Sequence, residues 1–92
     1  MKQDQTTQNH CHVLTIIDGV SGEIIDVIEI KHFEIEGFST QFDVPVETDP
    51  EMLDRYAVGP DDLPFLKAAL AEEVHFDLSK YAYFIEAATI DA

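Results

Sequence analysis

Residues 13–30 read VLTIIDGVSGEIIDVIEI, in which two runs rich in β-branched side chains flank the turn sequence GVSG. β-Branched side chains fit a pleated strand, and glycine supplies the positive φ that a tight turn requires. The stretch from His12 to Ile30 therefore predicts a β-hairpin. A turn centred on Val20-Ser21 places Asp18 opposite Glu23 and His12 opposite Glu29.

This register gives the predicted hairpin two faces that are both apolar in the middle. One face carries Val13, Thr15, Ile17, Ile24, Asp26, Ile28 and Ile30, and the other carries Leu14, Ile16, Ile25 and Val27. A hairpin with one solvated face would alternate apolar and polar residues instead. We therefore expect either a sheet that is covered on both sides or an apolar patch that serves as a docking surface.

The segment KHFEIEGFSTQFDVP, which follows the hairpin, predicts a short helix. Its phenylalanines are spaced by five and four residues, and a proline keeps the residue before it out of the helical region, so the helix ends before Pro45. The next stretch, ETDPEMLDRYAVGP at 47–60, predicts an acidic loop with one helical turn after Pro50.

The sequence DDLPFLKAALAEE at 61–73 predicts a second helix with a leucine stripe, capped by Asp61 or Asp62. The sequence VHFDLSKYAYFIEAATI at 74–90 alternates in side-chain type around Tyr81 and Tyr83, which predicts a closing strand paired with the hairpin. We therefore predict an α+β fold. It consists of an N-terminal β-hairpin, a short helix, an acidic loop, a second helix and a C-terminal strand that completes a small antiparallel sheet.

The length of 92 residues suits one domain, and the apolar fraction of 46% indicates a globular one. We place this α+β domain at 10–92, after a polar tail at 1–9 that is expected to be disordered because it has nothing to bury. The opening sequence lacks the apolar core of a secretory signal, and the single cysteine cannot form an internal disulfide. These features predict a cytoplasmic protein.

The charge of the chain is strongly negative. Asp and Glu number 19 against 5 Lys and Arg, so the formal net charge is -14. Such a field repels nucleic acid and anionic lipid, so we expect no nucleic-acid partner and no membrane partner, whereas a basic protein would be attracted. From Glu34 to Asp62 there are nine acids and one base, Arg55.

The stretch His10-Cys11-His12 concentrates the most reactive side chains. Strand alternation puts the two imidazoles on one face and the thiol on the other, so neither a metal cluster nor a Cys–His pair forms from these residues alone. His75 could act as a base toward Cys11 only if the fold joined them. We predict no catalytic residue, no metal site and no cofactor, and hence a protein that is not an enzyme.

Several short motifs of the chain carry a resemblance. They are Val44-Pro45, Asp49-Pro50, RYAV with Tyr56 and Val58, Phe65-Leu66 and the closing FDLSKYAYFIEA. Over residues 13–86 the chain resembles a family of small, acidic, uncharacterised bacterial proteins associated with toxin–immunity loci, including contact-dependent growth inhibition systems. It departs from that pattern at Gly59, where the family has Ser or Thr, and at Pro64. The resemblance implies an immunity role and supplies no catalytic residues.

The sequence therefore predicts an immunity protein that neutralises a cognate toxin domain, of nuclease type with a basic active cleft, through an acidic surface. The predicted partner-binding residues are the carboxylates Asp43, Glu47, Asp49, Glu51, Asp54, Asp61 and Asp62, with Met52 and Tyr56 as apolar anchors. The alternative is a regulatory or structural subunit without catalytic activity that self-associates into a homodimer through the second face of the hairpin.

Overall fold

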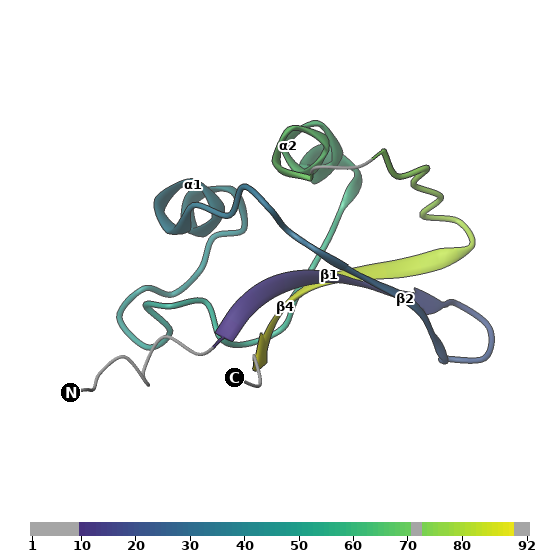
Figure 1. The fold of residues 1–92 in the computed structure, drawn as a ribbon, viewed down its shortest axis with the longest axis horizontal. Coiled ribbons are helices and arrows are strands. Elements are labelled where there is room, and N and C mark those ends of the chain that lie inside the picture. The colour runs from purple at the N-terminus through teal and green to yellow at the C-terminus, as the bar shows by residue number, and fades with distance from the viewer. Residues whose placement is uncertain (1–9, 71–72, 90–92) are drawn as a thin grey trace.

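Four antiparallel strands and two helices make up the computed structural model, which describes residues 10–70 and 73–89. The strands are β1 (His10–Asp18), β2 (Ile24–Glu29), β3 (Tyr56–Ala57) and β4 (Tyr81–Thr89), and they form one sheet in the order β2-β1-β4-β3. The helices are α1 (Ile35–Gln41) and α2 (Leu63–Ala69), and both lie on the same side of the sheet (Figure 1). The predicted α+β fold is confirmed, whereas the predicted tail at 1–9 lies outside the described residues.

The hairpin forms as predicted near its turn but not further along. Ile17 pairs with Ile24, and the carboxylate of Asp18 accepts hydrogen bonds from the amides of Val20 (2.7 Å) and Ser21 (3.2 Å). A bulge between Ile16 and Ile17 then shifts the register by one residue. Since the extra residue lies on β2, the predicted pairing of His12 with Glu29 is wrong, and Val13 pairs with Glu29 instead.

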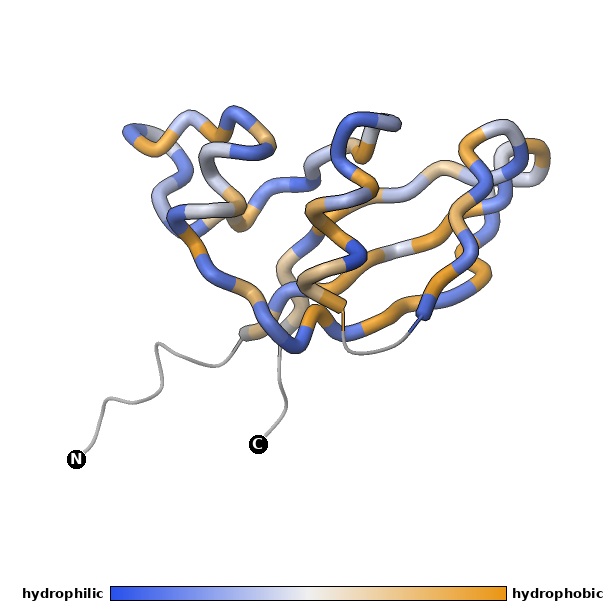
Figure 2. The backbone as a smooth tube through the Cα atoms, turned by 90° about the horizontal axis from the view of Figure 1, so that it is seen from above, coloured by the Kyte–Doolittle hydropathy of each residue, from blue (hydrophilic) through white to orange (hydrophobic). Residues whose placement is uncertain are grey.

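The bulge also decides which residues of the hairpin share a face. Leu14 pairs with Ile28, so two residues predicted on opposite faces lie on the same one. That face is covered by the helices and forms the core, whose fully buried members are Leu14, Phe38, Met52, Leu66 and Ile85. Figure 2 shows hydrophobic residues running through the sheet, and hydrophilic and hydrophobic residues alternating along the connecting loops.

Helix α1 ends before Pro45, as predicted, and it begins at a side-chain cap. The carboxylate of Glu34 accepts hydrogen bonds from the amides of Glu36 (3.3 Å) and Gly37 (2.8 Å), which leaves fewer amides at the helix start without a partner. Phe38 is buried, and its ring packs against that of Phe65 from α2 at 4.7 Å between centroids. The two helices are therefore joined by an aromatic contact.

Helix α2 is shorter than predicted. A 3₁₀ turn at Pro60–Asp62 precedes it, the Asp62 carboxylate accepts no capping hydrogen bond from its amides, and Leu70 already has extended backbone angles. Strand β4 is also shorter than predicted, because it begins at Tyr81 rather than near Val74. Instead of a helical turn after Pro50 there is a hydrogen-bonded turn, in which the Met52 amide donates to the Asp49 carbonyl (3.1 Å). The short strand β3 was not predicted.

The face of the sheet opposite the helices is also apolar. Thr15 and Ile17 of β1 share this face with Val27 of β2 and Phe84 of β4, as the strand pairing requires. Neither helix reaches it, since both lie on the other side (Figure 1). In the described part of the chain, no helix has the length and apolar content needed to span a membrane.

Candidate functional site

The predicted partner-binding residues belong mainly to the loop between α1 and β3, residues 43–55. In Figure 1 this loop passes around the end of the sheet at which β1 begins. It is built from turns, with hydrogen bonds from the amides of Thr48 (3.0 Å) and Asp49 (2.7 Å) to the carbonyl of Pro45. Asp43 and Met52 adopt positive φ, 55° and 56°, so the chain changes direction sharply at both positions.

Asp49 holds this loop together from the inside. Its side chain is buried, with 8% exposed. One carboxylate oxygen accepts the amide of Leu53 (2.7 Å), and the other accepts the amide of Asp54 (3.1 Å) and the hydroxyl of Tyr56 (2.5 Å). Three donors thus converge on one carboxylate, which gives Asp49 a structural role and removes it from the exposed surface.

These contacts change the acidity of both partners. Burial raises the pKa of the Asp49 carboxyl, but the hydrogen bonds from Tyr56, Leu53 and Asp54, with the nearby His12, lower that pKa more, so it lies below its ordinary value. Burial and the hydrogen bond to Asp49 raise the pKa of the Tyr56 hydroxyl to about 12, helped by the charges of Asp49 and Asp54. Around neutral pH the pair is therefore a neutral phenol donating to a charged carboxylate.

His12 ties the same loop to strand β1. Its Nε2–H donates to the Met52 carbonyl (2.9 Å), and Nε2 lies 3.2 Å from the Glu51 carbonyl oxygen. The imidazole ring stacks on the ring of Phe33, with 3.8 Å between the ring centroids. His12 is buried, and the Met52 side chain is 0% exposed. Met52 is therefore part of the core rather than a surface anchor. The sequence signal for His12 was its position in one alternating series with the apolar Leu14 and Ile16.

The remaining predicted carboxylates divide into two groups. Asp43, Glu47, Glu51, Asp54 and Asp61 are exposed. Asp62 is half-buried, because one of its oxygens accepts the side-chain amide of Gln41 (2.7 Å) and the other accepts the backbone amide of Gly59 (2.8 Å). Asp62 therefore fastens the 3₁₀ turn to the end of α1. Tyr56 is half-buried, and its hydroxyl is bound to Asp49.

Arg55, the single base of this acidic segment, is already engaged within the molecule. Its guanidinium lies 3.3 Å from a carboxylate oxygen of Glu86 and 4.6 Å from the ring centre of Phe84. Both contacts hold it against strand β4. The Arg55 guanidinium is therefore directed toward the sheet rather than toward the exposed carboxylates of Asp43, Glu47 and Asp61.

Of the reactive stretch at 10–12, the structure describes the side chains of Cys11 and His12, and these two do not form a site together. Cys11 is a half-buried free thiol, and its neighbour His12 is held by the loop. No group of three or more His, Cys, Asp or Glu side chains suited to a metal ion occurs in the described part of the chain.

Residues 11–86 match the family model described as a domain of unknown function, DUF7683. The chain belongs to the DUF7683 family. The match covers β1 from Cys11 onward, all of β2 and β3, both helices and most of β4, so the family domain corresponds to the fold described above. No curated protein and no solved structure matches the chain. The family description names no activity, so the immunity role stays a prediction.

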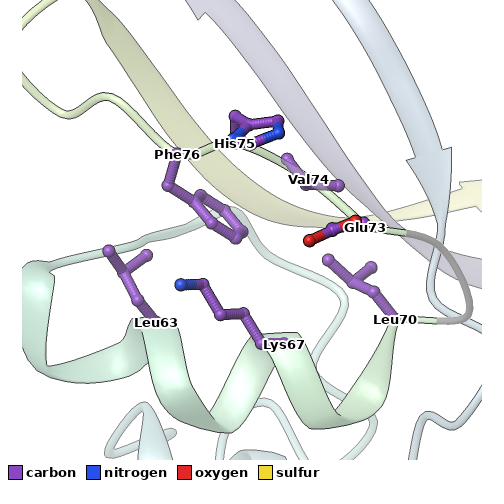
Figure 3. A pocket seen from close by; sticks show the side chains of 7 residues that line it. All are labelled: Leu63, Lys67, Leu70, Glu73, Val74, His75 and Phe76. Atoms are coloured by element: carbon purple, nitrogen blue, oxygen red, sulfur yellow. The ribbon is translucent and has the colours of Figure 1, made fainter.

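A surface pocket of about 450 Å³ lies between α2 and the segment 73–76, away from the predicted residues. Figure 3 shows the Lys67 amine and the Glu73 carboxylate directed toward it, with the rings and methyl groups of Phe76, Leu63 and Leu70 around them. His75 lines this pocket and Cys11 does not. The pocket therefore does not bring His75 and Cys11 together.

Proposed function

We propose that this DUF7683 protein is an immunity protein, which binds a nuclease-type toxin at its basic active cleft and neutralises it. The observation that supports the proposal is the exposed acidic loop surface, which we define as Asp43, Glu47, Glu51, Asp54 and Asp61. A nuclease cleft carries positive charge because it must hold a phosphate backbone. A surface with the opposite charge can occupy that cleft without any chemistry of its own.

The way the loop is held supports the same proposal. Asp49 and His12 fix its backbone from the inside, through hydrogen bonds to Leu53, Asp54 and Met52. A surface that is already ordered loses less conformational entropy when it binds. The formal net charge of -14 adds a long-range attraction toward a basic partner, which speeds association. Since a nuclease toxin acts where nucleic acid lies, the proposal places the protein in the cytoplasm.

The direct test uses the protein encoded immediately upstream in the source genome. The C-terminal domain of that protein is expressed in cells with and without this chain. We expect the domain alone to arrest growth of the cells, and co-expression of this chain to restore it. For the purified pair, Kd is expected to rise steeply between about 50 and 500 mM salt, because screening weakens exposed charges. Equal binding at both salt concentrations, or an upstream domain that is not toxic, would contradict the proposal.

Two matched variants locate the surface. Glu47→Gln with Asp54→Asn removes two charges from the acidic loop surface, and Glu36→Gln with Glu73→Gln removes two exposed charges outside it. The first pair is expected to slow association by about tenfold or more at low salt, and the second pair by much less. Equal effects of the two pairs would mean that net charge alone, rather than this surface, governs binding.

A further inference from the structure

Strand β2 forms an open edge of the sheet. Among the described strands it pairs with β1 alone, at the end of the order β2-β1-β4-β3. The Ile30 amide donates to the His12 carbonyl (3.0 Å), so the backbone groups of Ile30, and by alternation those of Ile28, point toward β1. The amides and carbonyls of Val27 and Glu29 therefore point away from the sheet, where a further strand could bind them.

Large aliphatic side chains are exposed along this edge. Ile24 is 61% exposed, Ile25 52% and Val27 50%. Native proteins limit pairing at an edge strand with charges, prolines, bulges or a covering segment. Strand β2 has a bulge and the exposed carboxylates of Asp26 and Glu29, but no strand covers its outer edge among the described residues. Here Val27 lies on the face that the helices leave uncovered, in line with Thr15 and Phe84. An added strand would extend this apolar face.

The charges at the edge identify the kind of strand that fits. Glu23, Asp26 and Glu29 are exposed along β2 and its turn. The neighbouring cation, Lys31, is 3.1 Å from the Glu29 carboxylate and so is already paired. A second copy of this chain would bring the same carboxylates and another net charge of -14 to the edge. Charge complementarity therefore favours a basic partner over self-association.

Asp26 gives this edge a specific chemistry. Its carboxylate accepts the outward amide of Val27 (2.8 Å). Since Asp26 pairs with Ile16, its side chain lies on the helix side of the sheet, opposite to that of Val27. An incoming strand that offers its own carbonyl to the Val27 amide would release the carboxylate, which could then pair with a Lys or Arg on the helix side.

We propose that the β2 edge binds an extended, basic segment of a partner protein by β-strand addition. The segment alternates apolar side chains, which lie beside Val27 on the uncovered face, with basic side chains, which lie beside Asp26. This site is separate from the acidic loop surface, so the proposal goes beyond the proposed function and does not depend on it.

The test uses a fluorescein-labelled peptide of about ten residues that alternates valine and lysine, with binding followed by fluorescence anisotropy. Two isomeric peptides carry N-methyl groups, on the valines in one and on the lysines in the other. When the peptide adds antiparallel to β2, the residue opposite Val27 is a valine whose amide faces the protein. N-methylvaline is therefore expected to weaken binding by about tenfold or more, and N-methyllysine by much less. Equal affinity of the two isomers would overturn the proposal.

Protein variants provide the second arm of the test. Val27→Pro removes the outward amide without removing a hydrogen bond to β1, and Asp26→Asn removes the charge. Each variant is expected to bind the unmethylated peptide about tenfold more weakly than the wild type. The double variant Glu47→Gln with Asp54→Asn is expected to bind it with nearly unchanged affinity. The peptide comparison uses the unaltered protein and stands even if Val27→Pro does not fold. Loss of binding only in the loop variant, or a stable dimer that Val27→Pro dissociates, would overturn the proposal.

Discussion

The hydroxyl oxygen of Tyr56 lies 2.5 Å from Oδ2 of Asp49, and this contact closes the acidic loop onto the sheet. Tyr56 begins strand β3 and pairs with Ile85 of β4, so its hydroxyl is fixed relative to the core. The same carboxylate gathers the amides of Leu53 and Asp54. One buried acid thus holds the backbone that presents the exposed ones.

Removing the Asp49 side chain should destabilise the fold. Asp49→Ala leaves the hydroxyl of Tyr56 and the amides of Leu53 and Asp54 without their acceptor. We expect the free energy of unfolding, measured with urea, to fall by about 2–4 kcal/mol. The exposed Glu47→Ala is the control and should change it by less than about 0.5 kcal/mol. Similar losses in the two variants would show that Asp49 has no special structural role.

The same carboxylate should make stability depend on pH. The folded-state pKa of Asp49 is lower than its ordinary value, so its charged form favours the folded state. This contribution is complete above the unfolded pKa of about 3.9 and is lost as pH falls through the lower, folded pKa. The difference in unfolding free energy between the wild type and Asp49→Asn should therefore shrink below about pH 4. A difference that stays constant down to about pH 2 would contradict this expectation.

The Tyr56 hydroxyl should lose its proton at a higher pH than an ordinary tyrosine. Because its pKa is raised to about 12, the absorbance difference between the wild type and Tyr56→Phe during alkaline titration should have its midpoint near that pH. The raised pKa also means that the neutral phenol favours the folded state. Its contribution is complete below the unfolded pKa of about 10 and is lost as pH rises from there through the folded pKa. A difference spectrum with its midpoint at the ordinary tyrosine value would refute the contact with Asp49 in solution.

His12 and its neighbour Cys11 should differ sharply in what they contribute to stability. His12→Ala removes the stacking on Phe33 and the hydrogen bond to Met52, so we expect a loss of about 2–4 kcal/mol in unfolding free energy. Cys11→Ala trims a half-buried thiol on the other face and should cost less than about 1.5 kcal/mol. Thermal unfolding of both variants measures the difference. If Cys11→Ala were the more damaging change, the assignment of His12 as the link between loop and strand would be wrong.

Local patterns in the sequence predicted the element types, but not the contacts that depend on a single inserted residue or on distant segments. The hairpin was evident from its β-branched runs, whereas the bulge near Ile25 shifted the register because two residues there oppose one. The acidic loop around Met52 predicts a surface anchor, whereas the structure buries this residue at a positive φ, with its carbonyl bound by His12, 40 residues away. Asp49 carries a local signal of its structural role, since its three donors all follow within seven residues.

The hairpin turn packs closely against the segment before β4, and one glycine makes this possible. The Gly19 amide donates to the Lys80 carbonyl (3.0 Å), and a Cβ placed on Gly19 would lie 2.8 Å from that backbone oxygen. Gly19→Ala must therefore push two backbone segments apart, which should lower the unfolding free energy by about 1–3 kcal/mol. Gly59→Ala is the matched control, because its Cβ would meet nothing nearer than the Asp62 carboxylate at 3.6 Å, an ordinary contact. Equal unfolding midpoints for the two variants in urea would show that the turn can move away from Lys80 without loss.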